Sequence, residues 1–198
     1  NWFHNIYEST IPIPSSIVVS SIIMLLAVLT EDLLFFIKHR ISHSLAFSWD
    51  WHEFHHSATQ MTIFSSYRNV VIEYVWMAPF SLPIEACSIL LVNEYLSRGY
   101  FIPVYIYIFF RTVHQLTNYV GHSSLKVIYP APFKHIFMSP SLHWIHHSAN
   151  PKHFDKNFGA VFVFWDKLCG TYMNEEHLKD INEFGVPNSD YNKHHPLY

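Results

Sequence analysis

Charged residues are scarce in this chain of 198 residues, of which only 14% are Asp, Glu, Lys or Arg; a typical soluble domain carries roughly 25%. The net charge is −3 and the basic residues form no run, so nucleic-acid binding has no electrostatic basis. Half of the residues are apolar, 18% are aromatic and the mean hydropathy is +0.11. This composition predicts a single-domain integral membrane protein.

Glycine and cysteine are also rare. The five glycines form neither a G-x-G-x-x-G fingerprint nor a P-loop, so no nucleotide cradle is visible. The two cysteines, Cys87 and Cys169, exclude a disulfide framework and lack metal-ligand spacing, so we interpret both as structural. A C-x2-C-H haem attachment is missing as well. Any electrons that the chain uses must therefore come from a separate carrier.

Histidine is abundant, with 16 residues. The stretch HRISHSLAFSWDWHEFHH carries five of them, and the element HWIHH near the other end carries three more: His39, His43, His52, His55, His56, His143, His146 and His147. Residues three or four apart lie on one face of a helix, and neutral imidazole is the commonest protein ligand for a metal. Eight imidazoles are too many for one ion, so the pattern predicts two metals close together.

A ninth ligand is expected at His122, which ends a long apolar run. Asn118 and His114 precede it by one and two helical turns and are further candidates on the same face. Asn118 has three possible roles: it ligates a metal, holds a metal-bound water or caps a helix. The remaining histidines lack a partner at ligand spacing or lie in a polar tail where we expect exposure: His4, His135, His153, His177, His194 and His195.

Carboxylates near the histidine motifs are candidates for orienting the imidazoles, because a metal-binding histidine usually donates its second N–H to an oxygen. They are Asp32, Asp50, Glu53 and Asp155; surface charge or helix capping is the alternative for each. No pair of E-x2-H repeats occurs, which disfavours a carboxylate-bridged helix-bundle site. Asp166 with Gly170 predicts a turn after the apolar segment 160–165.

The longest uncharged run extends from Ser9 to Thr30, and about 20 apolar residues span a bilayer core. We expect a transmembrane helix that continues to Lys38, after an aromatic interface segment over residues 1–14. Lys38 and Arg40 mark its end as cytosolic by the positive-inside rule. A buried helix of a soluble protein is the alternative.

Residues 70–121 predict a helical hairpin in or across the membrane, although Pro79 and Pro83 interrupt it. Its two legs return the chain to its starting side, so that both histidine sets face one compartment. The expected layout has five parts: interface segment and transmembrane helix 1–38, first histidine motifs 39–69, hairpin 70–121, last motif and cytosolic cap 122–175, and polar tail 176–198. The chain begins with Asn1 rather than Met, which leaves open whether an earlier membrane segment is missing.

The histidine motifs resemble the signature of the fatty acid hydroxylase / sterol desaturase superfamily. H-x3-H and two H-x2-H-H elements occur in its order, and supporting words match it: W-x2-H-x2-HHS from Trp49, SPSLHWIHHS, DKNFG and WDKLCGTY. The resemblance extends from about Asp32 to Tyr172. The family commonly has H-x3-H before His122, where this chain has Asn118. Arg68 falls where the family often has Arg; a solvated or headgroup-binding Arg is the alternative.

The resemblance implies an all-α integral membrane protein whose cytosolic helical cap holds a histidine-rich dimetal site. It implies an O2-dependent lipid oxidoreductase with two Fe ions, in the endoplasmic reticulum with the metal site facing the cytosol. The electron donor would be cytochrome b5, an NAD(P)H-fed reductase or a tetrahydropterin. Sterols, fatty acyl or sphingoid chains and alkylglycerols remain open as substrates, as do hydroxylation and desaturation. The alternatives are a membrane metal transporter or metal-binding protein, and a catalytically inactive relative.

Overall fold

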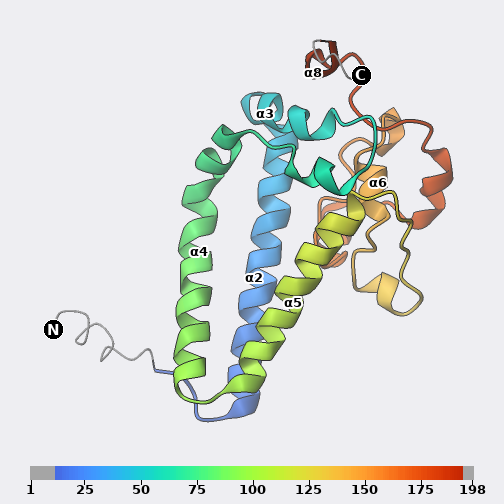
Figure 1. Ribbon diagram of the computed structural model, residues 1–198. Helices are drawn as coiled ribbons and strands as arrows, with labels where there is room; N and C mark the ends of the chain where they lie inside the picture. Colours follow the sequence, from blue (N-terminus) through green and yellow to red (C-terminus); the bar gives the residue numbers. More distant parts are fainter. Residues whose placement is uncertain (1–11, 194–198) are drawn as a thin grey trace.

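The computed structural model describes residues 12–193, which fold into helices joined by irregular segments (Figure 1). Three long helices stand side by side: α2 (Ile17–Ser44), α4 (Val71–Ser97) and α5 (Phe101–Gly121). Two isolated bridges are the only β pairing within this range, and it contains no strand. The prediction of an all-α fold is confirmed.

Helix α2 begins where Ser16 accepts a hydrogen bond from the amide of Val19 at 3.4 Å. The helix then continues through a largely apolar sequence and past the polar residues around His39 to Ser44, six residues beyond the predicted end at Lys38. The first H-x3-H motif therefore lies on the last turns of α2. Since its two histidines are one turn apart, both side chains face the same side of the helix.

Helices α4 and α5 are joined by a tight turn at Gly99, whose φ of +76° is a left-handed conformation that glycine adopts without strain. Pro79 and Pro83 lie inside α4 without ending it. The hairpin returns the chain to the end of the bundle where α2 finishes (Figure 1). His122, the residue that follows α5, thus reaches the same end as the first histidine motifs.

Two of the long helices, α2 and α4, are long and apolar enough to cross a membrane. Helix α4 buries few of its side chains, and large apolar residues along the bundle face outward; the exposed fractions of Val71, Ile89 and Phe109 are 77%, 64% and 59%. An exposed apolar surface of this extent suits lipid hydrocarbon rather than water. The fold is that of an integral membrane helical protein.

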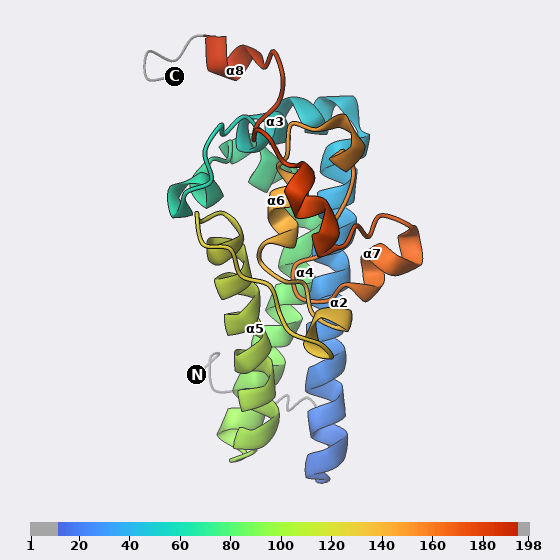
Figure 2. The same ribbon diagram turned by 90° about the vertical axis from the view of Figure 1, so that its right-hand side faces the viewer.

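The cap consists of the short elements around the end of the bundle where α2 and α5 finish, and Figure 2 shows them from the side. Its own core is formed by Met138, Leu142, Ile145 and Val163. The elements of the cap are α3 (Ala46–His56), η1 (Ile63–Tyr67), η2 (Phe133–His135), α6 (Leu142–His146), η3 (Pro151–His153), α7 (Phe164–Cys169), η4 (Glu175–Asp180) and α8 (Asp190–Lys193).

A buried carboxylate fastens the cap to the bundle. Asp32 of α2 accepts hydrogen bonds from the amides of Val161 and Phe162 at 2.9 and 3.3 Å, and from the indole N–H of Trp165 at 2.9 Å. Asp32 thus holds the backbone of the cap and does not orient a histidine, which differs from the expectation. The reason is that the cap returns to α2 almost 130 residues later in the chain.

Asp166 holds the backbone inside the cap in a similar way. Its carboxylate accepts hydrogen bonds from the amides of Phe158 and Gly159 at 2.9 and 2.8 Å and from the Thr171 hydroxyl at 2.6 Å. Its helix α7 ends at Gly170, whose φ of +71° is left-handed. The turn predicted from Asp166 to Gly170 is therefore wrong in its position, because residues 166–169 belong to α7 and the chain turns only at Gly170. Asp166 is therefore structural.

Candidate metal centre

The structure brings nine of the predicted histidines into two groups whose nitrogen atoms lie within 4.8 Å of one another. We call them the first and the second cluster. The first cluster contains five imidazoles and the second contains four: His39, His43, His52, His56 and His146, and then His55, His122, His143 and His147. Each cluster combines histidines from residues 39–56 with histidines from residues 122–147.

The two clusters adjoin each other. The rings of His56 and His147 stack with centroids 4.2 Å apart, and His52 and His55 follow at 5.3 Å. Each cluster therefore offers a separate set of nitrogens, while the sets remain in contact. This arrangement suits two metal ions side by side.

Gly121 permits the approach of α5 to α6. A Cβ at this position would lie 3.1 Å from the Cβ of His143 and 3.3 Å from the carbonyl oxygen of Pro140, which is closer than ordinary van der Waals contact. The missing side chain lets His122 reach His143, and their Nε2 atoms are 3.1 Å apart. The last turn of α5 thus completes the second cluster.

Oxygen atoms around the clusters fix the orientation of the imidazoles. Nδ1 of His39 donates to the carbonyl of Phe158 at 2.9 Å, and Nδ1 of His146 donates to that of Lys156 at 2.7 Å. A carbonyl oxygen can only accept, so each Nδ1 carries the proton and each Nε2 keeps a lone pair. Histidines that bind metals are oriented in this way.

His122 follows the same rule, since its Nδ1 donates to the carbonyl of Asn118 at 2.7 Å. The backbone of Asn118 therefore orients a predicted ligand. Its side chain lines a cavity beside the second cluster, as does that of His114. His114 belongs to neither cluster and packs against Phe35 with ring centroids 5.0 Å apart.

Inside the clusters the Nε2 atoms converge on one another. His55, His122, His143 and His147 form a chain of Nε2 contacts of 3.0, 3.1 and 3.0 Å. Two nitrogens that bind one ion with bonds of about 2.1 Å are separated by roughly 3.0–3.4 Å. Nε2 of His52 and Nε2 of His146 are buried without a hydrogen-bond partner among the described residues. The donor set fits a pair of metal ions.

Two carboxylates contact the first cluster. Nδ1 of His52 donates to Glu73 at 2.7 Å, and Nδ1 of His43 lies 3.4 Å from Asp155. The contact with His43 lowers the pKa of Asp155. Asp155 was among the expected carboxylates and Glu73 was not. In the described part of the chain, the side chains of Asp50 and Glu53 make no hydrogen bond to a cluster histidine.

Burial favours the neutral form of the imidazoles of the second cluster. The pKa values of His55, His143 and His147 lie well below the ordinary value of 6.5, first because the side chains are buried and then because other imidazoles surround them. A metal binds the neutral form of imidazole. The second cluster is therefore ready for a metal at neutral pH.

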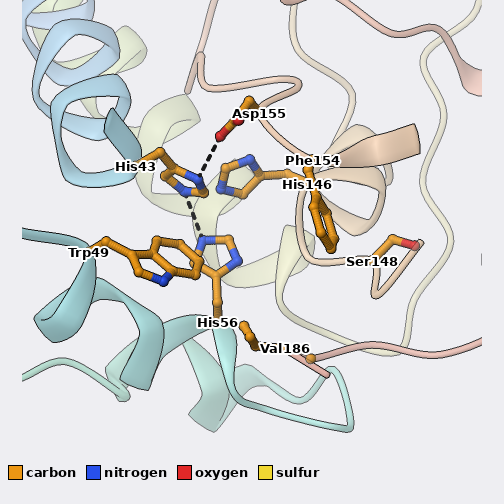
Figure 3. A pocket seen from close by; sticks show the side chains of 9 residues that line it. His43, Trp49, His56, His146, Ser148, Phe154, Asp155 and Val186 are labelled. Carbon is orange, nitrogen blue, oxygen red and sulfur yellow. Dashed lines mark hydrogen bonds and ion pairs between the residues drawn. The ribbon is translucent and has the colours of Figure 1, made fainter. Parts of the chain in front are cut away.

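Two cavities lie on different sides of the clusters. Figure 3 shows one of about 240 Å³ in the cap, where Trp49 and Phe154 line it together with His43, His56 and Asp155. The second cavity, of about 370 Å³, lies among α2, α4 and α5 and reaches His39, His52, His55, His122 and His143. We call them the cap cavity and the bundle cavity. Both clusters contribute to the wall of the bundle cavity.

Other residues singled out in the sequence lie outside the two clusters. Arg68 donates to the hydroxyl of Ser57 at 2.7 Å and lies over the ring of Phe54. Cys87 and Cys169 are exposed and unpaired thiols. His135 is exposed, whereas His153 is completely buried. The remaining predictions, for His4, His194 and His195, lie outside the described residues.

Comparison with known proteins settles the family. The model of the fatty acid hydroxylase family matches residues 24–171, which include every histidine of the two clusters. This chain belongs to the fatty acid hydroxylase family. The family resemblance predicted from the histidine motifs is thus confirmed. No solved structure matches the chain.

This member of the fatty acid hydroxylase family is similar to several named lipid monooxygenases and hydroxylases. It is 30% identical to alkylglycerol monooxygenase of Caenorhabditis elegans over 147 residues, which is 74% of this chain and 26% of the relative. The human alkylglycerol monooxygenase is 26% identical, with 75% and 30% covered. Ornithine lipid hydroxylase OlsE of Rhizobium tropici is 25% identical, with 70% and 38% covered. The chain therefore spans about a quarter to two fifths of the length of these relatives.

The role of Glu73 gives a first prediction. Replacing Glu73 by Gln removes the charged acceptor of His52 Nδ1–H, and we expect a loss of roughly 10–100-fold in metal affinity, as for other residues that orient metal-binding histidines. Competition with a chelator, followed by metal analysis, measures the change. Glu94→Gln is the control, because Glu94 pairs with Arg98 near the far end of the same helix. Equal metal retention in both variants would contradict the assigned role.

Proposed function

We propose that this chain forms the oxygenase core of a membrane-bound, non-haem di-iron enzyme that hydroxylates a polar lipid. The main support is the convergence of nine imidazoles, several of which have Nδ1 tied to an outer oxygen and Nε2 directed inward. The clusters lie at the end of the bundle beside the cap. A metal transporter would instead be expected to place its ligands along a path within the membrane helices, so we do not favour that alternative.

Iron bound at the clusters would supply the activation of O2 that attack on an unactivated C–H bond requires. The residues of this chain hold and shield that site. Glu73 and the carbonyls of Phe158 and Lys156 fix the imidazole rings. The burial of the histidines excludes water from the site, which limits side reactions. The bundle cavity is where we place the substrate.

The walls of the bundle cavity support a lipid with a polar group near the reacting carbon. Phe35 and Met77 provide apolar contacts, while Lys38, Glu85 and Arg111 provide charged groups. Arg111 is already paired with Glu31 at 3.0 Å, whereas a simple hydrocarbon chain would give Lys38 and Glu85 no polar group to contact, which is unfavourable. The relatives named for an alkylglycerol and an ornithine lipid are consistent with this choice, and their names favour hydroxylation over desaturation.

We place the chain in the endoplasmic reticulum membrane, with the metal site facing the cytosol. Lys38 and Arg40 lie at the cap end of α2, as the positive-inside rule requires for a cytosolic end. Electrons would reach the site from cytochrome b5, a reductase or a tetrahydropterin. The cap cavity, which borders His43, His56 and His146, is on the side where such a donor could approach.

Metal analysis followed by turnover tests the proposed function. We expect two iron ions per chain in detergent-purified protein produced with iron. With a suitable reductant and heavy-isotope O2, an alkylglycerol or an ornithine lipid should gain one labelled oxygen atom, detected by mass spectrometry. A sterol serves as the comparison substrate. Protein that holds two irons and yet oxidises none of these lipids would refute the proposed substrate class, and folded protein without metal would refute the di-iron site.

A further inference from the structure

A third group of metal-binding side chains lies in the cap, outside both clusters. The side-chain nitrogens of His153 and His177 and a carboxylate oxygen of Asp180 lie within 4.8 Å of one another. His153 is completely buried, and both of its ring nitrogens lack a hydrogen-bond partner among the described residues. A buried polar group without a partner is unfavourable by about 1–3 kcal/mol. His153 therefore indicates a ligand that the protein chain itself does not provide.

The 3₁₀ helix η4 brings two of the three residues together. Side chains at positions i and i+3 of a 3₁₀ helix eclipse each other, and His177 and Asp180 have this spacing. Their Nδ1 and Oδ2 atoms are 3.2 Å apart. In a tetrahedral zinc site with bonds of about 2.0–2.1 Å, two ligand atoms are separated by roughly 3.3 Å. The pair already has the spacing of two ligands on one ion.

The third residue is held in place by Asn150. The side chain of Asn150 caps η3 by accepting from the amide of Lys152 at 3.1 Å, and it also donates to the carbonyl of Asp180 at 3.1 Å. The amide of Ala149 donates to the carbonyl of Glu183 at 2.9 Å. These bonds join η3, which ends at His153, to η4. The backbone is thus fixed before any ion binds.

We propose that His153, His177 and Asp180 bind a single Zn²⁺ ion, separate from the metals of the two clusters. Two imidazoles and one carboxylate are a known ligand set for zinc, with water in the fourth position. The side chains of His177 and Asp180 are 45% and 42% exposed, so water has access and both residues can close on the ion. A simple pair between His177 and Asp180 would leave the buried ring of His153 without a partner.

The zinc ion would stabilise the loop that supports the first cluster. His153 is three residues before Lys156, whose carbonyl accepts from His146, and two before Asp155, which contacts His43. Fastening His153 to η4 restricts the backbone that carries both oxygens. The third site thus has a structural role, and it does not depend on which metal or substrate the clusters bind.

Zinc binding by the chain of 198 residues tests this inference. Protein with iron in its clusters is titrated with Zn²⁺ in detergent, freed of excess metal and analysed for both elements. We expect one zinc per chain in addition to iron, and a higher unfolding temperature with zinc. His177→Gln and Asp180→Asn should each weaken zinc binding at least about 10-fold and keep the iron. Glu176→Gln is the matched control, because Glu176 is an exposed residue of the same helix outside the group.

Two results would overturn the proposal: a wild-type chain that takes up no zinc beyond its clusters, or variants that bind zinc as tightly as the control. Since His177 and Asp180 are partly exposed, both substitutions should leave the fold intact. His146→Ala, a variant of the first cluster, separates the two proposals. It should lose iron and retain this zinc, so the failure of one site does not imply the failure of the other.

Discussion

Replacement of His146 by alanine is expected to reduce lipid hydroxylation more than about 100-fold, because even residues that only orient metal ligands contribute roughly 10–100-fold. His146 is one of five imidazoles in the first cluster, and it is the only one that comes from α6. Its removal leaves one ion short of a ligand and deletes the link between α6 and the histidines of α2 and α3. The chain should still insert into the membrane, since α2 and α4 are unchanged.

The measurement compares turnover and iron content of His146→Ala with those of wild type and of His135→Ala. His135 is an exposed histidine of the cap that belongs to neither cluster, so its replacement should change neither quantity. A His146→Ala protein with full iron and wild-type turnover would show that the first cluster is not the reacting centre. Equal losses in both variants would point to a general effect on the cap.

The second large effect is expected for Asp32→Ala, which should destabilise the junction between bundle and cap by about 3–9 kcal/mol. The substitution leaves two buried backbone amides and the indole N–H of Trp165 without their acceptor, and each unsatisfied group costs about 1–3 kcal/mol. Asp32→Asn should lose less, because its single carbonyl oxygen can still accept.

Denaturant-induced unfolding in mild detergent, followed by the fluorescence of Trp165 and the other tryptophans, measures this loss. Thr30→Ala is the matched control on α2, because Thr30 is exposed and its hydroxyl bonds only the carbonyl of Leu26 in its own helix. If Asp32→Ala unfolds at the same denaturant concentration as Thr30→Ala, the carboxylate does not secure the cap.

The long helices could be predicted from the sequence because apolar runs of membrane length have few alternatives. The apolar run after Ser16 predicted the position of α2, but not its continuation to Ser44. Polar residues around His39 mark the edge of the apolar run, and a helix that leaves the membrane keeps its backbone hydrogen bonds. Pro79 and Pro83 do not mark a helix end either, since α4 continues through both.

The histidine motifs predicted that ligands would gather, but not how they would divide. Adjacent residues point about 100° apart around a helix, so the last two histidines of each H-x2-H-H motif face different clusters. His52 and His56 belong to the first cluster while His55 belongs to the second. On α6, His143 and His147 belong to the second cluster and His146 to the first. This division depends on how the helices are rotated, which spacing alone does not specify.

Contacts between residues that are far apart in the chain could not be predicted from the sequence. Glu73 is 21 residues from His52, at the start of another helix, and only the packing of α4 against α3 brings them together. His153 lacked a partner at ligand spacing because its neighbours, His177 and Asp180, return to it after the chain has passed through α7. Local periodicity carries no information about such returns.

The division of each H-x2-H-H motif between two clusters has a consequence for how the centre assembles. Helix α3 and the α6 motif each carry histidines of both clusters. When such a rigid helix is oriented so that its histidines of one cluster surround an ion, its remaining histidine points to the position of the second ion. Capture of the first ion thus lowers the entropic cost of capturing the second. If the proposed site binds two ions, their loading would therefore be cooperative, and the form that holds a single ion would be rare at equilibrium.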